Sequence, residues 1–240
     1  MGPQHSLSNF IQTLTSNLSN VKRLVEKACH DSGRSLQDVH LIAVSKTWPV
    51  DHILPVVEQG HFLLGENKVQ ELTAKSPVMP DEIEWHFIGG LQRNKVRKVI
   101  QHSSWIHSVD SIRLLETINR VAHEEQRKPH IFIQVNIDSE DTKGGFELSA
   151  VLEAVTLAHQ LTHVELAGLM CIPSPHPTPE QSRPAFKRLR ELQDQMRELT
   201  GAGMPYLSMG MSHDYQVAIE EGATHIRVGS AIFGSRNYPT

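Results

Sequence analysis

The chain has little cysteine and no long apolar segment. Its 240 residues include only two cysteines, Cys29 and Cys171, which form no CxxC pair. This favours a reduced, cytoplasmic setting over a disulfide framework. No apolar stretch approaches the length of a membrane span, and residues 1–5 lack the basic and apolar regions of a secretory signal. The formal net charge of -4 gives no reason to expect nucleic acid or an anionic membrane as the main partner.

Two further motifs are missing. No GxGxxG opens any helical segment, which weighs against a dinucleotide-binding fold. Fifteen histidines are present, and His159 and His163 have the spacing of a helical ligand pair, but no glutamate stands in the zincin position. No metal site is therefore expected.

Strand-like and helix-like segments alternate along the chain. An opening amphipathic helix is predicted over residues 7–32 because apolar side chains recur at spacings of three and four. Helical patterns also cover residues 112–126, 148–161 and 181–199. Apolar runs predict strands at residues 41–46, 62–66, 85–89, 105–109, 131–136, 166–172, 206–210 and 225–229.

Eight strands with intervening helices, preceded by an extra N-terminal helix, predict an α/β fold, a closed (β/α)8 TIM barrel. A length of 240 residues fits one large domain, so residues 1–240 are expected to form a single barrel domain. The alternative is an open doubly wound sheet with a ligand at its switch point.

Lys46 ends the first apolar run, residues 40–46. A lysine at the rim of a buried sheet is partly desolvated, so its pKa falls and a fraction is neutral amine. Such an amine can attack an aldehyde to form a Schiff base. Lysines also end strands simply by reaching out to solvent. On this run alone, Lys46 is a candidate covalent anchor with an ordinary structural alternative.

The last two strands each run into glycine and serine. Gly210, Met211 and Ser212 follow one strand, and Gly229 and Ser230 follow the next. Glycine permits close backbone approach to a ligand, and serine caps a new helix whose free N–H groups bind anions. The pair of turns predicts a phosphate cradle.

The barrel hypothesis brings these features together. Sites in such barrels lie at the carboxyl ends of the strands, with phosphate often between the loops after strands seven and eight. Strand one closes beside strand eight, so Lys46 is expected next to the cradle. This arrangement describes a pyridoxal 5'-phosphate (PLP) pocket or, less specifically, a Schiff-base aldolase without cofactor.

Several motifs resemble those of the pyridoxal phosphate homeostasis proteins. They occur in the family's order, and the resemblance runs from about residue 10 to residue 238. The matching segments are residues 43–47, 65–71, 85–89, 168–173, 207–212 and 227–234. The resemblance implies a barrel of the alanine racemase N-terminal-domain type, which is PLP fold type III.

The resemblance also implies the cofactor-binding residues. Lys46 matches the lysine that carries the cofactor as a Schiff base, and Asn67 matches a residue lining its ring. The remaining matched positions are Met170, Ser208, Gly210, Met211, Ser212, Arg227, Gly229 and Ser230. No catalytic residue is assigned.

Arg227 matches the family arginine that faces the pyridine nitrogen. An arginine stays protonated and only donates hydrogen bonds, so a ring nitrogen facing it is left without a proton. The cofactor is then a weaker electron sink, and carbanion chemistry is not promoted.

Some positions depart from the family pattern. Gly90 stands where histidine is common and Arg93 where serine is common, while Lys68 and His213 occupy variable positions. At these positions the resemblance does not determine the structure of the outer rim of the site. The proline-rich residues 173–179 are expected to be either a stiff connection or a flap over the pocket.

The chain ends just beyond its last motif, so no second, β-rich domain of the racemase type is expected to close the site. We therefore expect a monomeric, cytoplasmic PLP carrier in vitamin B6 and amino-acid or keto-acid homeostasis, without strong turnover. Apo-enzymes that use PLP are candidate acceptors. The alternatives are a racemase-like enzyme acting on a small amino acid and a phosphate-sugar aldolase using Lys46.

Overall fold

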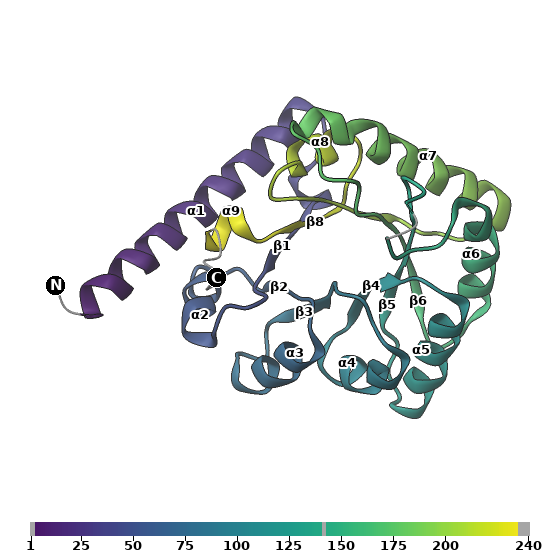
Figure 1. Ribbon diagram of the computed structural model, residues 1–240, viewed down its shortest axis with the longest axis horizontal. Helices are drawn as coiled ribbons and strands as arrows, with labels where there is room; N and C mark the ends of the chain where they lie inside the picture. The colour runs from purple at the N-terminus through teal and green to yellow at the C-terminus, as the bar shows by residue number, and fades with distance from the viewer. Residues whose placement is uncertain (1–2, 141–142, 235–240) are drawn as a thin grey trace.

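The structure, a computed structural model, describes residues 3–140 and 143–234. At its centre is a closed barrel of parallel strands in sequential order (Figure 1). The strands are β1 (His40–Val44), β2 (Leu63–Glu66), β3 (Glu84–Phe87), β4 (Trp105–Val109), β5 (His130–Gln134), β6 (Glu165–Met170), β7 (Tyr206–Met211) and β8 (His225–Val228). The predicted (β/α)8 barrel is confirmed.

Closure between the first and last strands decides the topology. β1 pairs with β8 in parallel, with Leu41 opposite Ile226 and Ala43 opposite Val228. The alternative of an open doubly wound sheet is therefore wrong. The closing pair also brings the loops after β1 and β8 to the same sector of the barrel rim.

Helices form the outer layer of the barrel (Figure 1). They are α1 (Pro3–Asp31), α2 (Val50–Glu58), α3 (Val69–Lys75), α4 (Val96–His102), α5 (Ile112–Glu124), α6 (Val151–Gln160), α7 (Arg183–Thr200), α8 (Tyr215–Glu220) and α9 (Ser230–Phe233). No helix among the described residues is long and apolar enough to cross a membrane.

The core lies mainly between the strands and these helices. Strands covered on both faces read as continuous apolar runs, which explains why their positions could be predicted. All five residues of β4 are buried. Inside the barrel, a smaller cluster consists of Trp105, Phe132, Ala167 and Met170.

The extra N-terminal helix is α1, which begins four residues earlier than predicted. Leu14, Leu18, Val21 and Val25 are buried, as the spacing of its apolar residues predicts. This face packs against α2, α8 and α9, so α1 fastens the start of the barrel to its end.

The first strand ends two residues earlier than predicted. β1 stops at Val44, and Lys46 lies in the turn that follows. Thr47 has a φ of 70°, which is incompatible with a continuing strand. The N–H of Trp48 donates to the carbonyl oxygen of Ser45 at 3.1 Å and closes the turn.

Candidate functional site

A pocket of about 590 Å³ lies at the carboxyl ends of the strands. Loops from every sector of the barrel contribute to it. Its lining consists of Val44, Lys46, Asn67, Ile88, Gly89, Gly90, Asp110, Gln134, Gly144, Ile172, Met211, Ser212, His213, Arg227, Gly229 and Ser230. We call it the rim pocket. Its volume lies within the range of small-molecule sites.

Most of the residues predicted to hold a cofactor lie on this pocket. Those in its lining are Lys46, Asn67, Met211, Ser212, Arg227, Gly229 and Ser230. The other three lie outside the lining. Met170 and Ser208 are fully buried inside the barrel. Gly210 has a φ of 90°, and a Cβ there would lie 2.5 Å from the Cβ of Ala218.

A buried ion cluster holds the turn that carries Lys46. Lys75 Nζ donates to Glu66 Oε1 at 2.7 Å, to Glu71 Oε2 at 3.0 Å and to the carbonyl oxygen of Ser45 at 3.0 Å. Ser45 Oγ donates to Glu66 Oε1 at 2.7 Å. The N–H of Thr47 donates to Glu71. The residues on both sides of Lys46 are thus tied to α3 and the end of β2.

The pKa values of the two carboxyl groups in this cluster are shifted in opposite directions. Burial raises the pKa of Glu66, and its hydrogen bond with Lys75 only partly offsets this. Burial also acts to raise the pKa of Glu71, but hydrogen bonds from the Thr47 N–H and Lys75 lower it overall. Glu71 accepts from the backbone N–H of Thr47 and from Lys75, so it links the turn directly to α3.

The turns after β7 and β8 are joined through one hydroxyl. Ser212 Oγ accepts hydrogen bonds from the N–H of Gly229 at 3.0 Å and of Ala231 at 3.3 Å. Gly229 lies against Val44, because a Cβ at Gly229 would meet the Val44 Cβ at 3.4 Å. The two predicted cradle turns and the end of β1 therefore adjoin one another.

Arg227 lies at the floor of the rim pocket and is 4% exposed. One terminal nitrogen donates to Ser208 Oγ at 2.5 Å, and the other donates to the carbonyl oxygen of Cys171 at 3.0 Å. Within residues 3–140 and 143–234, no carboxylate forms an ion pair with its guanidinium. Burial lowers the pKa of Arg227, yet an arginine remains charged at neutral pH.

Two further groups complete the polar lining. Asn67 Oδ1 is buried and has no hydrogen-bond partner among the described residues. An unpaired buried oxygen is costly, so it favours a ligand that donates to it. Cys171, behind Arg227, has a pKa raised to about 12 by burial, so its thiol is protonated and behaves as a small apolar group.

The sequence did not reveal every residue at this rim. Asp110, Gln134 and Ile172 line the pocket although none was predicted to do so. Asp110 follows β4 directly, and a position just after a barrel strand is the signal that could have identified it. Gly90 also lines the pocket, whereas Arg93 is exposed and begins a short 3-10 helix.

The loop of residues 173–179 lies beside the loop after β5. Ser174 donates from its N–H and from its hydroxyl to Asp138, at 2.7 Å each. Lys143 Nζ donates to the Ser174 hydroxyl oxygen at 2.9 Å. These contacts tie the beginning of the proline-rich segment to the neighbouring loop.

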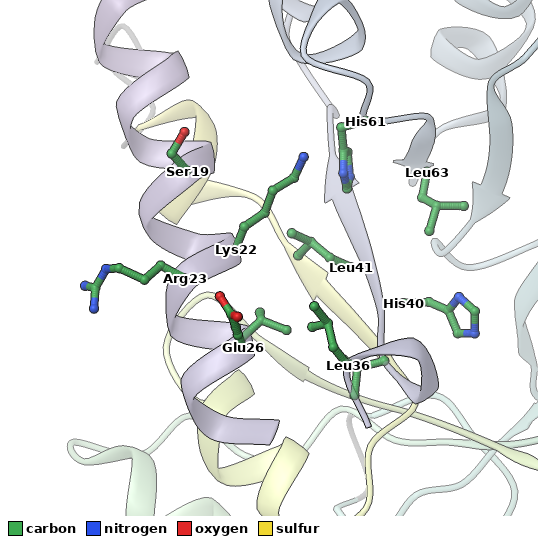
Figure 2. A pocket seen from close by; sticks show the side chains of 11 residues that line it. Ser19, Lys22, Arg23, Glu26, Leu36, His40, Leu41, His61 and Leu63 are labelled. Carbon is green, nitrogen blue, oxygen red and sulfur yellow. The ribbon is translucent and has the colours of Figure 1, made fainter. Parts of the chain in front are cut away.

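A second pocket, of about 560 Å³, lies between α1 and the beginnings of β1 and β2 (Figure 2). We call it the helix pocket. On its sheet side are Leu41, Leu63 and His61, and on α1 are Lys22 and Glu26. None of the predicted site residues lines it. Figure 2 shows Lys22 reaching toward the sheet.

Comparison with known proteins agrees with the fold and motifs. Residues 12–237 match the family described as alanine racemase, N-terminal domain. A pyridoxal phosphate homeostasis protein of Aquifex aeolicus is 41% identical over 92% of this chain and 97% of its own length. The chain belongs to the family of pyridoxal phosphate homeostasis proteins. The Escherichia coli family member is 36% identical over 94% of this chain and 97% of its own.

Solved structures include similar chains with the same fold. PipY of Synechococcus elongatus, in a structure with PLP bound, is 35% identical, with a TM-score of 0.77 over 88% of this chain and all of its own. An alanine racemase of Clostridium difficile has a TM-score of 0.74 at 14% identity, over 95% of this chain and 58% of its own. The latter likeness concerns the fold alone.

Proposed function

We propose that this chain binds pyridoxal 5'-phosphate in the rim pocket and serves vitamin B6 and amino-acid or keto-acid homeostasis. The observation that carries the proposal is the convergence of Lys46 with the Ser212–Gly229 turns on one pocket. The names of its relatives and the PLP-bound PipY structure support the choice of cofactor.

The residues of the rim pocket fit this group. PLP carries an aldehyde, a phosphate and a ring with polar substituents, and when bound it stabilises negative charge beside an amine carbon. Lys46 supplies an amine for the aldehyde, which supports the proposed Schiff base. Ser212, Ser230 and the glycine at 229 supply hydroxyls and close backbone approach for a phosphate. The unpaired oxygen of Asn67 supplies an acceptor for a ligand hydroxyl.

Arg227 bears on how strongly the pocket can use the cofactor: it does not promote carbanion chemistry, although it does not forbid it. Its guanidinium faces the pocket as a donor, and no carboxylate of the described residues pairs with it. A pyridine nitrogen placed against it receives no proton, so the electron sink stays weak. We propose that the chain has little turnover of its own. A rate with amino acids on the order of 1 per second or faster would contradict this.

The remaining parts of the proposal concern the oligomeric state, the cellular location and the delivery of the cofactor. We propose that residues 1–240 act as one monomeric, cytoplasmic PLP-binding domain and deliver the cofactor to apo-enzymes that require it. Mixing the loaded protein with such an apo-enzyme and following its recovery of activity tests delivery. Recovery no faster than with free PLP at the same concentration would contradict it.

The deciding experiment is Lys46→Ala, with Lys22→Ala in the helix pocket as the matched control. Each purified protein is incubated with PLP, and its visible absorbance and borohydride-reducible mass adduct are measured. We expect Lys46→Ala to lose the yellow colour and the adduct while keeping its fold, because the amine is gone. Lys22→Ala should retain both. A reducible adduct in Lys46→Ala would assign the anchor to another lysine.

A further inference from the structure

A row of hydrogen-bonded side chains crosses the inside of the barrel beneath Arg227. Ser208 Oγ, which contacts Arg227, lies 2.8 Å from His107 Nδ1. His107 Nε2 lies 3.0 Å from His86 Nδ1, and His86 Nε2 lies 3.1 Å from Glu84 Oε1. Ser208, His107 and His86 are each no more than 1% exposed.

The row connects the two ends of the barrel. Glu84 is the first residue of β3, so it lies at the amino ends of the strands, opposite the rim pocket. Its side chain is 44% exposed. His107 on β4 meets Ser208 on β7 across the barrel. A group at the far surface is thus joined to a residue of the pocket through buried contacts.

With both imidazoles neutral, the carboxylate of Glu84 sets the direction of every bond in the row, because it can only accept. At the other end, arginine can only donate, so Ser208 Oγ accepts from Arg227. The Ser208 hydroxyl also donates to His107 Nδ1, provided that this nitrogen carries no proton. His107 must then carry its proton on Nε2 and donate to His86 Nδ1. His86 likewise donates from Nε2 to Glu84, because a carboxylate can only accept.

The protonation states agree with this direction. The hydrogen bond from His86 lowers the pKa of Glu84, which is therefore a carboxylate at neutral pH. Burial lowers the pKa of His86, and its hydrogen bond to Glu84 only partly opposes this. Burial, with smaller contributions from His86, His225 and Arg227, lowers the pKa of His107 strongly. Both imidazoles are thus neutral and have one donor and one acceptor nitrogen each.

We propose that Glu84 is a positioning residue that holds Arg227 in its cofactor-facing orientation through His86, His107 and Ser208. The proposal rests on the proposed function only for what Arg227 faces. The direction of the row is a property of the cofactor-free chain. Glu84 does not line the rim pocket, and the hydrogen bonds that connect it with Arg227 are those of the row.

The substitution Glu84→Lys tests the direction of the row. A lysine ammonium can only donate, so it places a donor where the carboxylate accepted. His86 must then accept at Nε2 and move its proton to Nδ1, and His107 must follow. Ser208 Oγ then receives donors from both His107 and Arg227. The row is reversed without any change to the residues that line the rim pocket.

The primary measurement is the ring ¹⁵N spectrum of cofactor-free protein labelled on histidine. We expect neutral His86 and His107 with the proton on Nε2 in the wild type, and on Nδ1 in Glu84→Lys. Glu84→Gln should retain the wild-type tautomers because its amide oxygen still accepts. Glu82→Lys, an equal charge change on the adjacent exposed segment, is the matched control. A cationic histidine in the wild type, or unchanged tautomers in Glu84→Lys, would overturn the proposal.

The second measurement connects the row with the pocket. PLP titration should show an affinity loss of about fivefold in Glu84→Lys, which is the effect of one misdirected hydrogen bond. Glu82→Lys should match the wild type. Altered tautomers with unaltered affinity and absorbance would overturn the positioning role. Absence of PLP binding by the wild type would instead refute the proposed function and leave the tautomer result standing.

Ser208→Ala cuts the row at its other end and serves also if Glu84→Lys fails to fold. Without the Ser208 hydroxyl, a change in the tautomers of His86 and His107 no longer alters the hydrogen bonding of Arg227. We therefore expect Ser208→Ala to weaken PLP binding, and Glu84→Lys to add no further loss in the double variant. If the two losses add, or if Ser208→Ala binds PLP as the wild type does, the coupling does not pass through the row.

Discussion

The rim pocket and the helix pocket have nearly equal volumes, about 590 and 560 Å³, but differ in how their polar groups are held. In the rim pocket, the turn bearing Lys46 is tied to a buried ion cluster, and Ser212 is hydrogen-bonded to the adjoining turn after β8. In the helix pocket, Lys22 is exposed, and Figure 2 shows Arg23 pointing away from the sheet. A fixed set of converging polar groups, rather than volume, distinguishes a chemical site.

The largest effect that this comparison predicts is on folding stability, from Lys75→Met. Lys75 and Glu66 are 6% and 0% exposed, and removal of the cation leaves a buried carboxylate without its charge partner. We expect a loss of about 3 to 5 kcal/mol in the free energy of unfolding, measured by urea titration. Lys22→Met, in the helix pocket, should change it by less than about 0.5 kcal/mol. Equal effects would mean that the ion cluster does not hold the rim.

The helix pocket should show its own signature in the dependence of stability on pH. Burial lowers the pKa of His61 to about 4, from a usual 6.5. Between pH 6.5 and 4, His61 binds a proton in the unfolded chain but not in the folded chain. The free energy of unfolding therefore falls as the pH falls from 6.5 to 4. Integrated over this window, the loss is about 3 kcal/mol.

His61→Leu isolates this contribution. Its unfolding free energy should fall less steeply than that of the wild type between pH 6.5 and 4, while His159→Leu, on an exposed position of α6, should follow the wild type. The His61 Nε2 atom is buried without a hydrogen-bond partner among the described residues, so the leucine costs little at pH 7. Identical pH profiles of His61→Leu and the wild type would show that the imidazole charges in both states.

The smallest predicted effects are on cofactor affinity. Ser212→Ala and Ser230→Ala each remove one hydroxyl from the cradle while the backbone N–H donors remain. We expect each to cost about 1 kcal/mol, or roughly fivefold in affinity, without preventing binding at high PLP concentration. Dialysis followed by PLP titration measures this. Ser19→Ala, in the helix pocket, is the control. Wild-type affinity in both cradle variants would move the phosphate elsewhere.

The features that could be predicted are those that depend on residues close together in the sequence. The strands lie close to their predicted positions because each is a short apolar run between polar turns, and the closed barrel follows from their order. The adjacency of the Gly229 turn and the Lys46 turn follows from that topology. The sequence could thus predict which residues gather at the rim.

Contacts between distant side chains could not be predicted. His107 and Ser208 are 101 positions apart and meet only because β4 and β7 face each other across the barrel. The contact between Lys75 and the Ser45 carbonyl likewise depends on the angle at which α3 meets the rim. The end of β1 could not be predicted because neither Lys46 nor Thr47 is a typical turn residue such as glycine or proline. Thr47 nevertheless adopts a left-handed conformation that ends the strand.

The closure of β1 on β8 has a consequence for the order of events during synthesis. Lys46 emerges early from the ribosome, but Gly229, which completes the pocket beside it, emerges 183 residues later by their positions. A nascent chain with seven strands therefore has the amine and the turn after β7, but lacks the turn after β8 that completes the cradle. Because pairing over such a separation has a high loop-closure cost, the rim is completed only when β8 docks. Tight capture of the cofactor thus reports that β8 has been synthesised and has paired with β1.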